Sequence, residues 1–217
     1  MTRKALVFYG GWEGHEPGPT SEIASGILAA EGFEVTRSEG TAILTETDLS
    51  GYDLIVPVMT MAEVEADAVK RLTAAVEAGT GLAGFHGGMA DTFRKNTDYQ
   101  FMVGGQFVAH PGNVIDYRVE ITRNGDALLD GIGDFDYQSE QYYMHVDPRI
   151  EVLATTTFSG EHAAWVKDTQ MPVVWKHRYG QGRVFYSALG HKAAEFDHPQ
   201  MREILRRGLS WAARTAA

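Results

Sequence analysis

Two histidines follow apolar runs and stand beside glycines. His86 ends the run Gly-Leu-Ala-Gly-Phe and precedes two glycines, and His191 comes directly after Ala-Leu-Gly. Glycines at a strand end permit tight or positive-φ backbone geometry, which presents the intervening side chain above the sheet beside free N–H groups. An imidazole presented in this way acts as a general base, a hydrogen-bond donor or a metal ligand. We therefore predict functional roles for His86 and His191, the alternative being histidines that only pack at strand ends.

A carboxylate followed by aromatic residues is the third candidate. Glu140 precedes Gln-Tyr-Tyr-Met-His, which contains Tyr142 and ends at His145. Aromatic faces pack on the C–H surfaces of sugars and carboxylates bind their hydroxyls, so Glu140 and Tyr142 suit a sugar site. The same residues also fit an ordinary half-exposed strand, and His145 is the weaker candidate of the three.

Two further segments add polar and aromatic side chains. Trp12 and His15 lie in a loop rich in Gly and Pro that follows the first apolar run, and His110 precedes a proline shortly after a glycine pair. Glycine pairs let a segment pass close to a ligand, and a residue before proline is held extended. We predict that Trp12, His15 and His110 line a substrate site. Three other histidines stand in less distinctive contexts and are interpreted as structural or solvated: His162, His177 and His198.

Composition excludes several classes of function. The chain of 217 residues has no cysteine, which excludes disulfides, thiolate zinc sites, iron–sulfur clusters and thiol nucleophiles. Its 19 basic and 29 acidic residues give a formal charge of −10, which disfavours nucleic acid and anionic membranes as partners. No apolar run approaches the roughly 20 residues of a membrane span, and the N-terminal run is too short for a signal peptide. We expect a cytoplasmic protein.

Alternating strands and helices in the first half predict where these residues lie. Apolar runs at 5–9, 33–36, 53–58 and 81–85 predict strands, and helices are expected from residue 20 or 21 to 30 and over 63–78. This order predicts parallel βαβ units, in which ligands bind at the carboxyl ends of the strands. His86 and the loop with His15 both lie at such ends. No phosphate-binding glycine motif follows the first strand, so nucleotide binding has no support.

The second half has the pattern of an antiparallel extension of the same sheet. Strands are expected at 117–121, 151–156, 163–166, 172–175 and 182–189, and a final helix over 199–213. We find no linker or repeat and expect one domain over residues 1–217. Tyr99 and Phe101, if exposed, are candidates for an interface in a homo-oligomer.

Several of these motifs together resemble the ThuA-like (trehalose-utilisation) family over nearly the whole chain. They are Tyr-Gly-Gly at 9–11 with His15, Gly-Phe-His-Gly-Gly at 84–88, Gly-Gly-Gln-Phe at 104–107 with His110, and residues 172–191, which contain Gly-Arg-Val-Phe-Tyr and end in Gly-His. The resemblance implies a flavodoxin-like, class I glutamine amidotransferase-like fold: an α/β three-layer sandwich with a mostly parallel central sheet and an antiparallel extension. Amidotransferases carry a cysteine where this chain has His86, so their activity is not carried over.

The resemblance implies a role in sugar metabolism, beside an NAD-dependent sugar dehydrogenase that makes 3-keto sugars. Isomerisation or cleavage of a keto sugar or disaccharide derivative needs a base and stabilisation of an enolate oxygen. We assign catalytic roles to His86, His191 and Glu140. These three are also the candidate ligands for a divalent metal, zinc or manganese, with backbone N–H groups at the elbow as the alternative. The substrate-binding candidates are His15, Trp12, His110, Tyr142 and Gly87.

Other classes of function compete with this hypothesis. A non-catalytic sugar-binding or partner protein would keep the fold and bind sugar without consuming it. A metal-dependent hydrolase of another substrate class would use the same histidines. An amidohydrolase with Ser139 or Ser187 as nucleophile is disfavoured, because neither serine has an elbow of its own.

Overall fold

The strands form one large sheet and one small one. The computed structural model describes residues 2–122 and 125–215. Within these residues the strands are β1 (Arg3–Gly11), β2 (Phe33–Glu39), β3 (Leu54–Thr60), β4 (Gly81–Phe85), β5 (Gly105–Ala109), β6 (Val114–Ile121), β7 (Phe135–Glu140), β8 (Tyr143–Val146), β9 (Glu151–Thr157), β10 (Gln170–Tyr179) and β11 (Gly182–Ser187).

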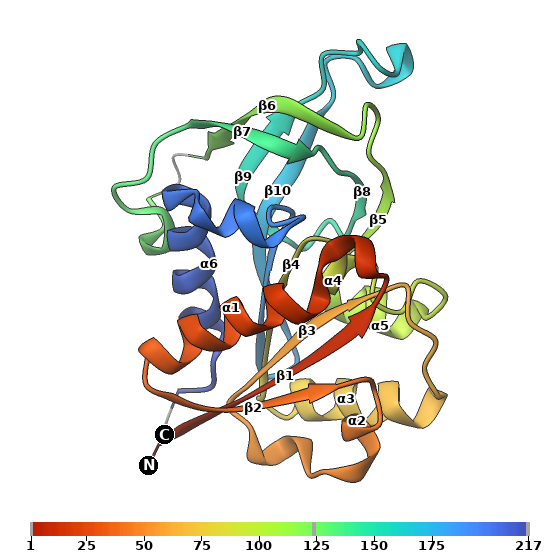
Figure 1. The fold of residues 1–217 in the computed structure, drawn as a ribbon, viewed down its shortest axis with the longest axis vertical. Helices are drawn as coiled ribbons and strands as arrows, with labels where there is room; N and C mark the ends of the chain where they lie inside the picture. The colour runs from red at the N-terminus through yellow and green to blue at the C-terminus, as the bar shows by residue number, and fades with distance from the viewer. Residues whose placement is uncertain (1, 123–124, 216–217) are drawn as a thin grey trace.

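The large sheet has a parallel half and an antiparallel half. Its order is β2-β1-β3-β4-β11-β10-β9-β6-β7, and β5 pairs with β8 in the small sheet. Strands β2, β1, β3, β4 and β11 are parallel, whereas β10, β9, β6 and β7 continue the sheet with antiparallel pairs. In Figure 1, β6 and β7 lie above the ends of the parallel strands. The predicted parallel core with an antiparallel extension is confirmed.

Helices cover both faces of the parallel half. The described helices are α1 (Pro17–Ala30), α2 (Ile43–Glu46), α3 (Ala66–Glu77), α4 (His86–Ala90), α5 (Thr97–Val103) and α6 (Pro199–Ala212), with 3₁₀ helices η1 (Glu13–His15), η2 (Leu49–Gly51), η3 (Ala127–Leu129), η4 (Ala164–Val166) and η5 (Ala193–Asp197). Helix α1 packs on β1, β2 and β3 beside α6, which packs on β4 and β11, whereas α3 packs with α2 and α5. Figure 1 shows the resulting three layers, which confirm the predicted α/β sandwich.

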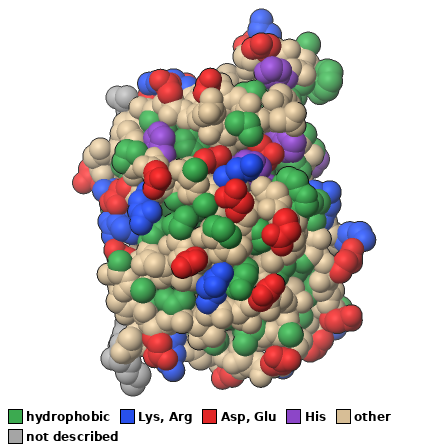
Figure 2. All heavy atoms as spheres, in the orientation of Figure 1, with side chains coloured by type: hydrophobic (Ala, Val, Ile, Leu, Met, Phe, Trp, Pro, Cys, Tyr) green, Lys and Arg blue, Asp and Glu red, His purple; other side chains and the backbone are tan. Residues whose placement is uncertain are grey.

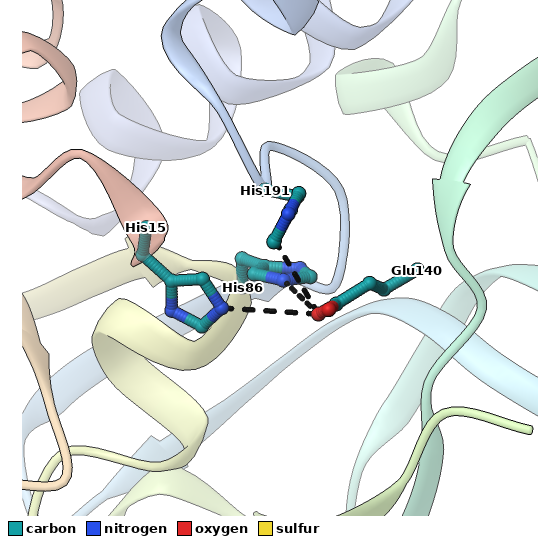
Figure 3. Close-up of side chains that lie close together, drawn as sticks. All are labelled: His15, His86, Glu140 and His191. Carbon is teal, nitrogen blue, oxygen red and sulfur yellow. Dashed lines mark hydrogen bonds and ion pairs between the residues drawn. The ribbon is translucent and has the colours of Figure 1, made fainter. Parts of the chain in front are cut away.

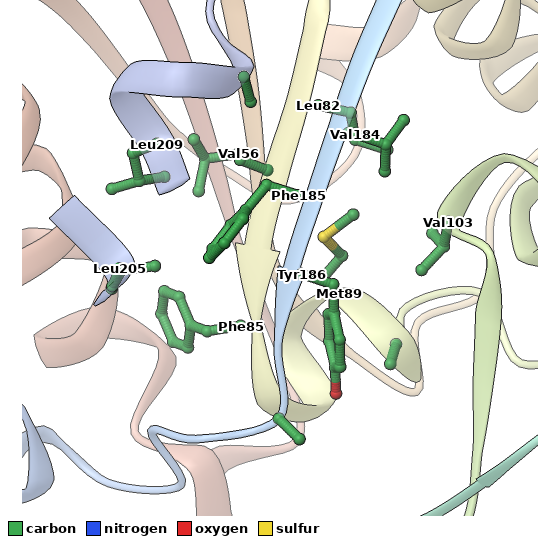
Figure 4. Packing of buried hydrophobic residues seen from close by; sticks show 14 of the residues in the cluster. Val56, Leu82, Phe85, Met89, Val103, Val184, Phe185, Tyr186, Leu205 and Leu209 are labelled. Atoms are coloured by element: carbon green, nitrogen blue, oxygen red, sulfur yellow. The ribbon is translucent and has the colours of Figure 1, made fainter. Parts of the chain in front are cut away.

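The core is built on side chains that alternate across the central strands. Phe185 of β11 points toward α6, where it lies near Leu205 and Leu209, whereas its neighbours Val184 and Tyr186 point to the opposite face (Figure 4). Successive strand residues face opposite sides of a sheet, so one buried strand serves two layers. The fully buried strand β4 does the same and holds His86 rigidly at its end.

Three predictions about local structure are wrong. Helix α1 begins at Pro17, not at Thr20 or Ser21, because a proline lacks an N–H and its fixed φ suits the first helical turn. The expected strand at 163–166 is instead the 3₁₀ helix η4, in the long connection between β9 and β10. Tyr99 is buried, with its hydroxyl donating to the Met89 carbonyl oxygen at 3.0 Å, so it offers no surface to another copy.

The surface carries mixed charges. Figure 2 shows acidic and basic side chains interspersed on one face, and the histidines visible there lie in its upper half. Phe101 is 56% exposed, and its ring lies against the guanidinium group of Arg149. Among the helices of the described residues, none has both the length and the apolar character needed to cross a membrane.

Candidate active site

His86 stands at a strained turn between β4 and α4. Its φ is +47°, a left-handed conformation that residues other than glycine rarely adopt. The buried hydroxyl of Tyr186 donates to the His86 carbonyl oxygen at 3.1 Å and so holds the turn from the neighbouring strand. The elbow predicted from the flanking glycines is therefore present, with an imidazole as the presented group.

The hydrogen bonds of His86 determine its tautomer. Its Nδ1 lies 2.8 Å from the Ala188 carbonyl oxygen, and a carbonyl only accepts, so Nδ1 carries the hydrogen. The other ring nitrogen, Nε2, lies 3.1 Å from Oε2 of Glu140. Neutral His86 therefore turns a nitrogen lone pair toward a carboxylate oxygen.

Two more imidazoles point at the same carboxylate oxygen. Besides His86 Nε2, His191 Nδ1 lies 3.4 Å and His15 Nε2 lies 3.8 Å from Glu140 Oε2. Figure 3 shows the three rings arranged around the end of the Glu140 side chain. One ligand atom from each of the four buried residues lies within 4.8 Å of those of the other three.

The topology explains why residues so far apart in sequence meet. Strands β1, β3, β4 and β11 are parallel neighbours, so the segments after them emerge at one edge of the sheet. His15 follows β1, His86 follows β4 and His191 follows β11. Glu140 ends β7 at the far side of the sheet order, and the antiparallel half brings it over that edge (Figure 1).

Burial and the mutual contacts shift the protonation of the cluster. Burial lowers the pKa of His86 to about 4, against the opposing effects of Glu140 and the Ala188 carbonyl. Burial also lowers the pKa of His191. For Glu140, burial by itself would raise the pKa, but the contacts with His15 and His86 outweigh it and lower that pKa. At neutral pH the imidazoles of His86 and His191 are thus neutral, and they face the Glu140 carboxylate.

This arrangement fits a divalent cation. His191 Nδ1 is buried and makes no hydrogen bond with any described residue, and the lone pair of His86 faces a carboxylate. Both atoms lack a positive partner, and a cation between them and Glu140 would supply it. Ligands about 2.0–2.2 Å from zinc lie roughly 3–4 Å from one another, close to the distances here. Three imidazoles and a carboxylate also suit zinc or manganese chemically.

A cavity of about 200 Å³ opens beside the cluster. Its wall includes His15, Glu140 and His110, together with Trp12 and Tyr142. His110 Nε2 lies 3.8 Å from the second carboxylate oxygen of Glu140, and the His110 side chain is 33% exposed. The structure therefore gathers four of the five predicted substrate-binding residues around one space, with His86 and His191 behind it. The fifth, Gly87, lies against the His15 ring and does not line the cavity.

Two aromatic residues of this wall, Tyr142 and Trp12, differ in what they offer a ligand. Tyr142 stacks on His86 with ring centroids 4.0 Å apart, so one face of its ring is occupied by protein. Trp12 is 46% exposed and meets His15 edge to face. Of these two, Trp12 therefore presents the more open aromatic surface to the cavity.

The other histidines lie outside the cluster. His177 is buried, and its Nε2 lies within 3.2 Å of the Val103 carbonyl oxygen, in agreement with a structural role. His145 is exposed on β8, and His198 precedes α6 with its Nε2 3.3 Å from the Asp136 carbonyl oxygen. His162 lies by Gly112, in the connection that leads from β9 to β10.

The comparison with known families agrees with this architecture. A family model named ThuA and described as trehalose utilisation matches residues 4–212. The chain belongs to the ThuA family. The resemblance predicted from the His86 and His191 motifs is therefore confirmed.

Solved structures share the ThuA fold. A ThuA-like protein from Bacteroides uniformis is 21% identical, with a TM-score of 0.77 over 97% of this chain and 91% of its own. One from Parabacteroides merdae is 18% identical, with a TM-score of 0.79 over 100% and 93%. A β-galactosidase from Bacillus circulans is 18% identical, with a TM-score of 0.60 over 97% of this chain but 30% of its own. No curated protein matches the chain in sequence.

Sequence reasoning missed polar residues that complete the ThuA site. Asp91 is buried in the cavity wall, and both of its oxygens bind the guanidinium of Arg94 at 2.8 and 2.6 Å. Thr60 at the end of β3 places its hydroxyl oxygen 2.8 Å from His15 Nδ1. The available signals were the i, i+3 spacing of Asp91 and Arg94 just after the elbow and the position of Thr60 at a strand end.

A second missed group holds His191 in place. The Glu195 carboxylate accepts from the His191 backbone N–H at 3.0 Å and from the Tyr137 hydroxyl at 2.7 Å. The same hydroxyl accepts from the Gly190 N–H at 3.2 Å. Burial raises the pKa of Glu195. This network fixes the backbone that carries His191, and Glu195 is a positioning residue.

Gly87 provides the space in which the His15 ring lies. A Cβ at Gly87 would stand 2.4 Å from His15 Cε1 and 3.0 Å from the Tyr142 hydroxyl oxygen. We expect Gly87→Ala to displace His15. Turnover should fall roughly 10- to 100-fold, and the free energy of unfolding should fall by about 1–3 kcal/mol. Steady-state kinetics and thermal unfolding measure the two effects.

Gly26→Ala in α1 is the matched control. A Cβ there meets nothing within 4 Å, so we expect unchanged kinetics and a gain of up to about 1 kcal/mol from helix propensity. Equal turnover of the Gly87 variant and the wild type would contradict the assigned position of His15.

Proposed function

We propose that this chain is an enzyme of carbohydrate metabolism that transfers protons next to the carbonyl of a keto sugar or disaccharide derivative, leading to isomerisation or cleavage. The observation that carries the proposal is the convergence of three imidazole nitrogens on one carboxylate oxygen beside a cavity. Trehalose utilisation, the description of the family, supports a sugar as the substrate.

We infer that His15, His86, His191 and Glu140 hold a divalent ion, zinc or manganese. The buried His191 Nδ1, which makes no hydrogen bond with any described residue, and the lone pair of His86 support this assignment. Such an ion supplies Lewis acidity, which polarises a carbonyl and stabilises negative charge on its oxygen.

His110 is the residue we assign to proton transfer. It lies on the cavity wall, more exposed than the four ligands, with Nε2 3.8 Å from the second carboxylate oxygen of Glu140. A C–H bond next to a carbonyl gives its proton to a base, and the electron pair moves toward the carbonyl oxygen. The carbon that loses the proton carries a hydroxyl, so the hydroxyl proton moves to the former carbonyl oxygen and the abstracted proton returns at the former carbonyl carbon, which completes an isomerisation. Glu140 would stabilise the imidazolium form of His110 between the two steps.

The remaining wall residues would bind the sugar. Trp12 offers an exposed aromatic face for the C–H surface of a ring. Arg94, oriented by Asp91, offers N–H donors to hydroxyls. A keto sugar arises by two-electron oxidation of a sugar hydroxyl, and we propose that an NAD-dependent sugar dehydrogenase supplies it.

Removal of metal is expected to abolish turnover and lower stability together. In D₂O the enzyme should exchange the C–H hydrogens beside the carbonyl of a 3-keto sugar for deuterium. We expect treatment with a chelator to stop this exchange and added zinc or manganese to restore it. An ion at about 1,000 times its Kd stabilises the folded state by about 4 kcal/mol, which raises Tm by roughly 8–16 °C for a domain of this size. NMR in D₂O and calorimetry measure the two effects.

The His191→Ala variant serves as the control for site-specific binding, since it lacks one of the four ligands. We expect its Tm to respond much less to zinc or manganese. Exchange that continues after complete metal removal would contradict the metal assignment. Binding of a keto sugar without exchange or product would favour the alternative of a sugar-binding protein.

A further inference from the structure

A second cavity adjoins the one beside the cluster. It encloses about 300 Å³ and shares Met61 and Arg94 with the wall of the inner cavity. Its two sides are the segments 61–64 and 93–96. Backbone hydrogen bonds tie these sides together at their base, from Met61 N to the Asp91 carbonyl and from Ala62 N to the Thr92 carbonyl, both at 2.9 Å. These hydrogen bonds therefore hold the two segments that line the cavity next to each other.

Met61 stands at the junction of the two cavities in a strained conformation. Its φ is +55°, and its side chain is large, apolar and 42% exposed. A residue other than glycine in this region costs free energy, and such residues are found where ligands are clamped. The strain directs an exposed apolar side chain to the point where a ligand would pass from one cavity to the other.

Arg94 stands at the same junction with a fixed orientation. Its Nε and Nη2 donate to the buried Asp91 at 2.8 and 2.6 Å. Its Nη1 makes no hydrogen bond with protein in the described part of the chain. A guanidinium held in this way presents its remaining N–H groups in a defined direction, toward an oxygen of a ligand that spans both cavities.

The lining of the outer cavity has the chemistry of a sugar site. Ala62 and Val64 supply apolar surface, and Asn96 and the ion pair between Lys95 and Glu63, at 2.7 Å, supply polar groups. A sugar ring packs its C–H surface on apolar side chains and directs hydroxyls to polar ones. Because the charges of Arg94 and Lys95 are both paired with carboxylates, the lining favours an uncharged ring over a phosphorylated one.

The volumes of the two cavities also fit sugar rings. A sugar ring of about a dozen heavy atoms displaces roughly six waters, or about 180 Å³ at about 30 Å³ for each water. The inner cavity of about 200 Å³ accommodates one ring and the outer cavity of about 300 Å³ another. We infer that segments 61–64 and 93–96 form a second sugar subsite, which binds the ring next to the reacting ring of a disaccharide derivative. This inference rests on the proposed function.

The test compares a two-ring with a one-ring substrate. We expect the metal-loaded wild type to bind and turn over a 3-keto derivative of trehalose at least about tenfold better, in Kd and kcat/KM, than 3-keto-glucose. Ala62→Phe places a ring in the outer cavity, and we expect it to lower the ratio of the two kcat/KM values about tenfold. Met61→Gly should also lower that ratio, and it should fold well because glycine adopts a positive φ.

Ala78→Phe, an exposed position at the end of α3, is the matched control and should keep the wild-type ratio. Equal kinetic and binding constants for the two substrates in the wild type would overturn the subsite, as would an unchanged ratio in a folded Ala62→Phe protein. Preferential binding of the two-ring compound without turnover would support the subsite and contradict the proposed function. Binding of neither compound would overturn both.

Discussion

Glu140→Gln is expected to abolish most of the activity while leaving the metal-free protein about as stable as the wild type. The carboxylate is the only acidic side chain in the cluster of four, and three imidazole nitrogens face one of its oxygens. Its replacement by an amide of the same shape removes the negative charge that a divalent ion requires and that stabilises His110. We expect kcat/KM to fall about 10³-fold and metal affinity to fall at least about 100-fold.

The stability of the metal-free protein should change little. The wild-type carboxylate is buried opposite a nitrogen lone pair of His86, whereas a glutamine N–H can donate to that lone pair across the same 3.1 Å. The amide gains this hydrogen bond, about 0.5–1.5 kcal/mol, but it loses the contacts with His15 and His86 that lower the pKa of Glu140 and so stabilise the carboxylate in the folded protein at neutral pH. We expect these two effects to offset each other.

Chemical denaturation of metal-free protein, metal titration and keto-sugar kinetics measure the three quantities. Glu34→Gln, at an exposed position on β2, is the matched control and should leave all of them unchanged. A Glu140 variant that loses stability and activity together would indicate a structural carboxylate. A variant that keeps its metal affinity would remove Glu140 from the set of ligands.

Part of this site was predictable because it follows from parallel topology. The carboxyl ends of neighbouring parallel strands meet at one edge, so the glycine-flanked histidines that follow β4 and β11 implied that His86 and His191 lie close together. The position of His15 after β1 follows from the same rule. Local glycine patterns and apolar runs were sufficient to predict the positions of His15, His86 and His191, because these residues follow strands of the parallel half of the sheet.

The geometry around Glu140 could not be predicted in this way. Glu140 belongs to β7, at the opposite end of the sheet order from β2, and it reaches the cluster because the antiparallel strands pass over the parallel edge. The course of those strands depends on register shifts such as the one between Pro172 and Val174 in β10, which no local pattern encodes. The aromatic neighbours of Glu140 indicated a sugar site but gave no partner for the carboxylate.

The ion pair between Asp91 and Arg94 was missed for a different reason. Charged pairs three residues apart are common on solvated helix surfaces, where they contribute little. Burial of Asp91 beneath the cavity makes this pair a means of orienting Arg94, and burial is a tertiary property. Tyr99 illustrates the converse, since an aromatic residue beside exposed Phe101 is fully covered by packing.

Substitution of His86 by glycine and by alanine is expected to separate its chemical role from its backbone strain. Both variants lose the imidazole, so we expect kcat/KM to fall about 10³-fold in each, along with metal affinity. Their stabilities should differ, because φ at this position is +47°. Alanine retains a cost of about 1–2 kcal/mol for the left-handed conformation, which glycine avoids. The glycine variant should therefore be the more stable by about 1 kcal/mol.

The space left by the imidazole also allows chemical rescue. In the wild type Tyr142 stacks on the His86 ring at 4.0 Å, and the Ala188 carbonyl accepts from its Nδ1 at 2.8 Å, so both surfaces remain to hold a free imidazole. We expect imidazole added to metal-loaded His86→Gly protein to restore activity at least about tenfold. It should have no such effect on Glu140→Gln, whose missing group is a carboxylate.

His177→Ala provides the matched control for loss of a buried histidine. His177 lies near backbone carbonyls, outside the cluster, so we expect its removal to cost about 1–3 kcal/mol of stability with kcat/KM within about threefold of the wild type. If His86 had only a packing role, its variants would follow this pattern and imidazole would change nothing. A loss of turnover that imidazole repairs in the glycine variant identifies the His86 ring itself, held by the strained elbow, as part of the machinery.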